Sequence, residues 1–213
     1  MLGLMQENGP LVIDDGQTTP PYLNDYPWNT SLNMLWIDSP AGVGWSIAGD
    51  EAALQANDLQ TSQDALQAMK SFYVKFPEYL PNELFISGES YAGVYVPWLS
   101  WQIYTNNQQV GYDPTAVQMN LQGFMVGNGA TNWEYDVEPS FAQTLRWFNI
   151  IPPSLLDSFE ANDCHYYFYP AFSPDVQSPK CDALWIKINE LASGLNWYDL
   201  YRPVYPDSAI LAK

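Results

Sequence analysis

Basic residues are scarce in this sequence. Seven lysines and arginines stand against 24 aspartates and glutamates in 213 residues, which gives a formal net charge of −17 at pH 7. A surface with this charge repels the phosphate groups of nucleic acids and of anionic membranes. We therefore expect no nucleic acid and no membrane among the partners of the protein.

Long apolar runs are also missing. No stretch approaches the roughly 20 apolar residues that a helix needs to cross a bilayer. Apolar residues nevertheless make up 47% of the chain, which is enough to fill a globular core. The sequence predicts a globular protein, and we expect neither a metal site nor a cofactor.

Cysteine is rare as well, with only Cys164 and Cys181, 17 positions apart. A disulfide between them would stabilise the fold by about 3 kcal/mol, because it restricts the unfolded chain. Two buried thiols are the alternative, and the sequence leaves both open. The triplet Asn29-Thr30-Ser31 is an N-glycosylation signal, and like a disulfide it points to the secretory route.

Ser90 lies in the hexapeptide Gly88-Glu89-Ser90-Tyr91-Ala92-Gly93. The apolar run 84–86 precedes it and a helix-like stretch, 94–99, follows it. A strand, a tight turn with small residues and a helix, with serine at the apex, are typical of the nucleophile elbow of α/β-hydrolases. The alternative is a serine that is buried or caps the end of a strand.

The pattern around this turn predicts a piece of an α/β fold. Apolar runs and helical spacing alternate, and prolines and glycines end them. The expected elements are a buried strand at 33–38, a helix at 57–76, a strand at 84–87, a helix from Ser90 to about 106, and a strand at 119–126. This βαβ order predicts that residues 1–129 form part of a mostly parallel sheet with helices on both faces.

Residues 130–213 differ in character. Helical segments are expected at 141–148, 154–159 and 183–191, joined by connections rich in proline and aromatic residues. No buried strand is evident. We interpret this part as a helical cap, inserted over the sheet.

Several motifs, taken together, resemble the serine carboxypeptidase family. The resemblance covers essentially the whole chain, because the motifs follow the family's order and spacing. They are Glu7-Asn8-Gly9-Pro10, Tyr26-Pro27-Trp28-Asn29, the run 33–46, the hexapeptide 88–93 with Tyr95-Val96-Pro97, Gly127-Asn128-Gly129, and 196–203. The resemblance implies a partial α/β-hydrolase fold and removal of C-terminal residues from peptides through an acyl-enzyme.

The resemblance also implies roles for individual residues. Ser90 would be the nucleophile, and the backbone N–H of Tyr91 would donate to the oxyanion. Glu7 and Glu89 would bind the C-terminal carboxylate of the peptide substrate. Two carboxyl groups in contact cannot both ionise cheaply, so one would keep its proton and donate a hydrogen bond to the substrate carboxylate. Alternatively, both glutamates are ordinary loop residues that face water.

The catalytic acid and base are not expected in this sequence. In α/β-hydrolases the triad runs Ser, Asp, His along the chain, and in the family the last two follow the cap. His165, the single histidine, and Asp199 both match cap positions. We expect a central piece that also lacks the Gly-rich front motif and is inactive alone, so that a second polypeptide could supply Asp and His.

Other interpretations stay open at this point. The chain could be a fragment of a longer enzyme, one part of a processed two-chain protein, or a non-catalytic descendant used for binding or assembly. A family member that passes the acyl group to an alcohol is a further alternative. The family resemblance and the glycosylation signal predict location in the lysosome or vacuole, or secretion.

Overall fold

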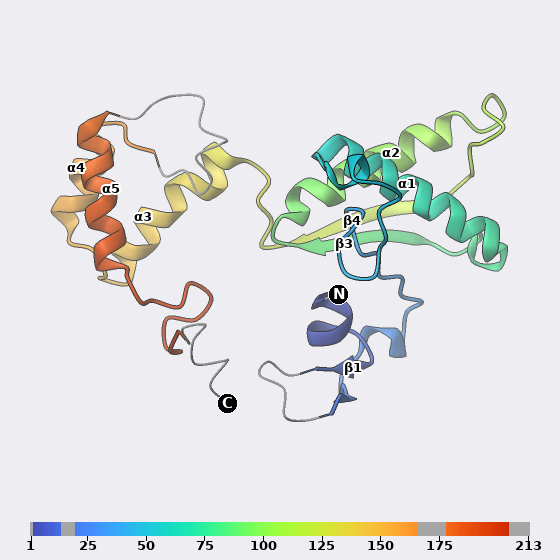
Figure 1. Ribbon diagram of the computed structural model, residues 1–213, viewed down its shortest axis with the longest axis horizontal. Helices are drawn as coiled ribbons and strands as arrows, with labels where there is room; N and C mark the ends of the chain where they lie inside the picture. The colour runs from blue at the N-terminus through green and yellow to red at the C-terminus, as the bar shows by residue number, and fades with distance from the viewer. Residues whose placement is uncertain (1, 14–19, 166–177, 205–213) are drawn as a thin grey trace. The chain divides into compact units, whose positions relative to one another are not determined.

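The computed structural model describes residues 2–13, 20–165 and 178–204 (Figure 1). It divides the chain into two compact units, Met1–Gly129 and Ala130–Lys213. Each unit contains its own cluster of buried apolar side chains. The division falls at the residue where the sequence changes character, while the roles of hydrolase core and cap stay predictions.

A parallel pair of strands lies at the centre of the first unit. β3 (Leu84–Glu89) pairs with β4 (Leu121–Gly127), so that Glu89 lies opposite Gly127. Helix α2 (Ala92–Gln108) connects the two strands, and α1 (Asp58–Lys75) precedes β3. The predicted order helix, strand, helix, strand is therefore confirmed.

Helix α1 begins and ends at clear signals. The side chain of Asn57 accepts a hydrogen bond from the backbone N–H of Gln60 at 2.9 Å, which caps the first turn. Pro77 follows directly after the C-cap residue Phe76. Leu66, Met69 and Tyr73 are the large apolar side chains that α1 buries, and their spacing of three and four places them on one face.

The two helices cover one face of the strand pair. The buried side chains of α1 meet Ile86, Val96 and Ile103 in one core, and Figure 1 shows both helices on the same side of β3 and β4. On the other face Phe85 and Met125 are 50% and 54% exposed. This part of the molecule is thus apolar on both faces but covered on one.

The C-terminal end of α2 is fastened by two asparagine side chains. Asn107 Nδ2 donates to the carbonyl of Met119 at 2.7 Å, and its Oδ1 accepts from the N–H of Met119 at 3.0 Å. Asn106 bonds in the same way to both backbone groups of Val117. The two amide side chains thus bond to the backbone of 117–119 as a neighbouring strand would, and they fix the position of the chain just before β4.

The prediction of a strand at 33–38 is wrong. These residues form no strand, β3 pairs only with β4 in the described part, and Leu35 and Ile37 are 44% and 38% exposed. Side chains hold the run instead, since Trp36 Nε1 donates to Asn8 Oδ1 at 2.9 Å. An apolar run indicates that its residues tend to be buried, but it does not show which strand they pair with.

Short elements make up the rest of the first unit. A two-stranded antiparallel sheet, which the sequence did not predict, joins β1 (Leu11–Val12) to β2 (Tyr22–Leu23). The remaining elements are short helices, namely η1 (Gly3–Glu7), η2 (Trp28–Thr30), η3 (Ala52–Leu54) and η4 (Pro77–Tyr79).

Helices are the regular elements of the second unit within its described residues. Its elements are η5 (Trp133–Val137), α3 (Glu138–Trp147), α4 (Pro153–Ala161) and α5 (Pro179–Leu191). Leu145, Ile151, Leu155, Phe159 and Ile188 are buried together between them. The three helical segments predicted from the sequence are confirmed.

A disulfide joins Cys164, just after α4, to Cys181 in the first turn of α5. Of the two states that the sequence left open, the structure contains the bonded one. Ser178 caps the same turn, because its Oγ accepts from the N–H of Cys181 at 3.2 Å. The bridge and the cap thus fix the start of α5 against the end of α4.

Loss of the Asn107 amide should destabilise the first unit. Asn107→Ala removes both bonds to the backbone of Met119, a buried residue, so we expect the free energy of unfolding to fall by about 2 kcal/mol. Urea denaturation of the chain measures this change. Thr105→Ala, at an exposed position of the same helix, is the control and should be neutral. Equal stability of the two variants would contradict the role of the amide.

Candidate active site

Ser90 lies at a sharp turn between β3 and α2. β3 ends at Glu89 and α2 begins at Ala92. The N–H of Ser90 donates to the carbonyl of Gly127 at 3.0 Å, which extends the strand pairing by one bond. The carbonyl of Ser90 then accepts from the N–H of Gly93 at 3.0 Å. Ser90 therefore makes the last hydrogen bond of the strand pairing with its N–H and an early hydrogen bond of the helix with its carbonyl.

Small residues allow the helix to approach the strand this closely. A Cβ atom added to Gly88 would lie 2.4 Å from the Cβ of Ala92 and 3.0 Å from Val96 Cγ2. Neither distance is compatible with normal packing, so a residue with any side chain at 88 would push α2 away from β3. Packing between β3 and α2 thus explains why small residues occupy positions 88 and 92.

The backbone of Ser90 is strained. Its φ is +63°, in the left-handed region, which costs a residue with a Cβ atom roughly 1–2 kcal/mol. The other described non-glycine residues with positive φ are Asn128, Asn149 and Asp163, and Asn and Asp adopt this region far more readily than other residues. Serine at this angle is an outlier of the kind found at functional sites.

The side chain of Ser90 is presented outward. The residue is exposed, whereas Ala92 and Gly93, which follow in the helix, are buried. The turn sets Tyr91 at the N-cap of α2, where backbone N–H groups and the helix dipole favour negative charge. A nucleophile held here lies beside groups that would stabilise an oxyanion.

A contact that the sequence did not reveal holds Tyr91. Its hydroxyl donates to Asp58, at 3.2 Å from Oδ1 and 3.4 Å from Oδ2. Its ring also packs against Tyr95, with ring centres 4.9 Å apart. Asp58 is the first residue of α1. Its position next to the helix cap Asn57 is the one sequence feature that could have drawn attention to it.

The two glutamates lie in different elements of the first unit. Glu89 is the last residue of β3, and Glu7 ends η1. Both are exposed, and within the described residues no hydrogen bond joins their side chains. Their joint binding of a carboxylate stays a prediction.

A cavity of about 810 Å³ lies beside β3, but it is not the site of the predicted chemistry. Its walls come from α1, α2, β3 and the run around 31–39, and Ser90, Glu89 and Glu7 are not among its lining residues. The run 33–38 contributes to its lining but forms no strand, and within the described residues β3 pairs with β4 alone. The cavity therefore reflects an open sheet edge.

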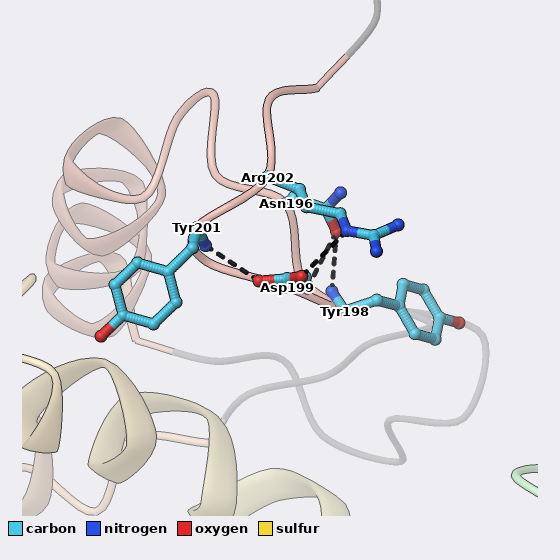
Figure 2. A network of polar contacts seen from close by, with 5 residues as sticks. All are labelled: Asn196, Tyr198, Asp199, Tyr201 and Arg202. Atoms are coloured by element: carbon cyan, nitrogen blue, oxygen red, sulfur yellow. Dashed lines mark hydrogen bonds and ion pairs between the residues drawn. The ribbon is translucent and has the colours of Figure 1, made fainter.

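His165 and Asp199 both take part in contacts within the second unit. His165 Nε2 lies 3.8 Å from Asp163 Oδ1. Figure 2 shows Asp199 in a tight turn, where its carboxylate contacts Arg202 Nε at 3.1 Å and accepts from the N–H of Tyr201 at 3.0 Å. Asn196 closes the same turn by accepting from two backbone N–H groups. The Asp199 carboxylate thus stabilises the turn in which it lies.

The remaining predicted positions are simple to place. Asn29 is exposed within η2, as a glycosylated residue must be. No group of metal-ligating side chains gathers within the described residues. Among the helices that the structure describes, none is long and apolar enough to span a bilayer.

Sequence comparisons identify relatives over the whole length of the chain. A family model described as serine carboxypeptidase matches residues 1–212. The chain is 36% identical to the mouse Lysosomal protective protein, over 94% of this chain and 40% of that protein. It is 33% identical to Serine carboxypeptidase 1 of Hordeum vulgare, over 98% of this chain and 40% of that protein. The chain spans about 40% of the length of these curated relatives.

The fold has a similar counterpart among solved structures. The crystal structure of Kex1(delta)p, a prohormone-processing carboxypeptidase from Saccharomyces cerevisiae, matches with a TM-score of 0.68 and 21% identity. The match covers 98% of this chain and 47% of that chain, and it confirms the predicted α/β-hydrolase fold. With a family model that extends over nearly every residue, the chain belongs to the serine carboxypeptidase family.

Proposed function

We propose that this chain carries the nucleophile of a serine carboxypeptidase, an enzyme that hydrolyses C-terminal residues from peptides. The observation that carries the proposal is the strained, exposed Ser90 at the turn between β3 and α2. A serine at an unfavourable backbone angle is expected where the turn must present its hydroxyl away from the sheet. Family membership supports the choice of peptides as substrates.

In the proposed reaction the Oγ atom of Ser90 attacks the carbonyl carbon of the last peptide bond. A base takes the proton of the hydroxyl, and the backbone N–H of Tyr91 donates to the oxygen that becomes negative. The base then gives that proton to the leaving nitrogen, the C–N bond breaks, and the C-terminal residue departs as an amine. Water hydrolyses the acyl-enzyme that remains and frees Ser90. One oxyanion donor lowers the activation free energy of such a reaction by about 3 kcal/mol.

We assign the base and its acid partner to polypeptide outside these residues. The chain has one histidine, His165, and its described contact is with Asp163. Asp199 is engaged in a turn with Arg202. The supporting argument is that a serine hydroxyl is a poor nucleophile without a neighbouring base.

Glu7 and Glu89 complete the proposed site by binding the C-terminal carboxylate of the substrate. Glu89 directly precedes Ser90, so a substrate carboxylate bound by Glu89 would lie close to the nucleophile. A protonated carboxyl can donate a hydrogen bond to that carboxylate, whereas two ionised glutamates would repel it.

We propose location in an acidic compartment such as the lysosome or vacuole, or secretion. The disulfide Cys164–Cys181 supports an oxidising route of synthesis, and the exposed Asn29 offers a glycosylation site. The name of the mouse relative, Lysosomal protective protein, is in line with this choice.

The strain at position 90 predicts an unusual order of stabilities. Glycine has no Cβ and adopts a positive φ without penalty, so Ser90→Gly should be more stable than Ser90→Ala by about 1 kcal/mol. Urea denaturation of both variants measures the difference. At Ser87, an exposed position inside β3, the order should reverse because glycine weakens a strand. The same order at both positions would refute the strained turn.

The nucleophile can be tested with a fluorophosphonate probe, which forms a bond to an activated serine and releases fluoride. The 213-residue chain alone should not react, because we assign the base to polypeptide outside it. The chain extended by the flanking segments that supply Asp and His should be labelled at Ser90 and should release C-terminal residues from a blocked dipeptide.

Ser90→Ala should abolish both the labelling and the release of residues from the extended form. Labelling of the isolated chain would show that a base within it, such as His165, activates Ser90. An extended form that stays unlabelled and inactive would reject the proposed function. Transfer of the acyl group to an alcohol, without hydrolysis, would identify an acyltransferase instead.

A further inference from the structure

We propose that Asp58 is a positioning residue for the oxyanion donor. Through the phenol of Tyr91 it connects the N-terminus of α1 to the residue whose backbone N–H donates to the developing oxyanion. The inference rests on the proposed role of Ser90 as nucleophile. It adds a residue 32 positions before Ser90, on a different helix, to those that determine the rate.

The carboxylate of Asp58 is itself firmly placed. It is partly buried, and as the first residue of α1 it lies where the helix dipole stabilises a negative charge. The preceding residue, Asn57, caps the helix by accepting from Gln60 at 2.9 Å. Because the first turn of α1 is fixed, so is the acceptor that it offers to Tyr91.

Tyr91 is held at both ends of its side chain. Its hydroxyl donates to Asp58, and its ring packs against the ring of Tyr95 one helical turn on. At the other end, its backbone joins the strained Ser90 to the first turn of α2. The ring and the N–H are attached to the same Cα atom, so a fixed ring limits rotation of the N–H.

Tyr95, which packs against Tyr91, lies within the influence of the same carboxylate. Burial raises the pKa of its phenol, and the negative charge of Asp58 raises it further. The packing of α1 on α2, through Leu66, Met69 and Val96, brings the carboxylate to this place.

The alternative is that the contact only stabilises the packing of the two helices. Such a role would change the free energy of unfolding but leave the reaction of folded protein unaltered. A positioning role instead changes the rate of phosphonylation at Ser90 at a temperature where every variant is folded. The two residues should also act as one unit in a double-mutant cycle.

The test uses Asp58→Ala, Tyr91→Phe and the double variant in the extended form in which Ser90 reacts with the fluorophosphonate. Each single change should slow labelling and lower kcat by about tenfold, less than the loss of a whole oxyanion donor, and leave KM within about twofold. The double variant should be no slower than the slower single variant. Asp58→Asn, which keeps an acceptor, should recover most of the rate.

Matched controls come from the same two helices. Asp64→Ala removes an exposed carboxylate of α1, and Tyr104→Phe removes an exposed phenol of α2; both should react at the rate of the wild type. A wild-type rate for Asp58→Ala, or losses that multiply in the double variant, would overturn the proposal. If the wild type itself is unreactive and inactive, the proposed function fails first.

A second measurement does not depend on activity. In ¹H–¹⁵N spectra of the 213-residue chain, the backbone amide resonance of Tyr91 should shift in Asp58→Ala, relative to Asp64→Ala and Tyr104→Phe. Asp58→Asn should leave it close to the wild-type position. An amide resonance of Tyr91 that is unchanged in Asp58→Ala would overturn the positioning role even where the rates differ.

Discussion

The close approach of α2 to β3 is the constraint on which the candidate site depends. The contact is made over Gly88, where no Cβ can fit against Ala92. Because the helix begins so near the strand, the chain has only Ser90 and Tyr91 in which to turn. A turn this short requires a positive φ, and Ser90 adopts it. The reactive position is therefore a consequence of packing between two regular elements.

Bonds on both sides of the turn hold this arrangement in place. The N–H of Ser90 donates to the carbonyl of Gly127 in β4, and the carbonyl of Ser90 accepts from the N–H of Gly93 in α2. α1 adds a third support through the contact of Asp58 with Tyr91. Sheet, crossover helix and preceding helix thus converge on two residues, which is how a rigid scaffold can offset the local strain of a single serine.

Prediction from the sequence succeeded where the signals were local. α1, β3, α2 and β4 have apolar periodicity and clear ends such as Pro77 and Gly127, and all are found in the structure. The run 33–38 was assigned wrongly, because its apolar residues could not identify the element against which they pack. The contact of Asp58 with Tyr91 spans 33 positions, so no pattern within one element could predict it, and the two-residue strands β1 and β2 are too short to show a period.

The uncovered side of the strand pair has a consequence for the behaviour of the chain in solution. In the described part β3 has a neighbour on one edge alone, and Phe85 and Met125 face outward beside it. An open edge with apolar side chains is a template on which strands of other molecules can add. A polypeptide that covered this edge would therefore protect the chain from aggregation during synthesis and folding.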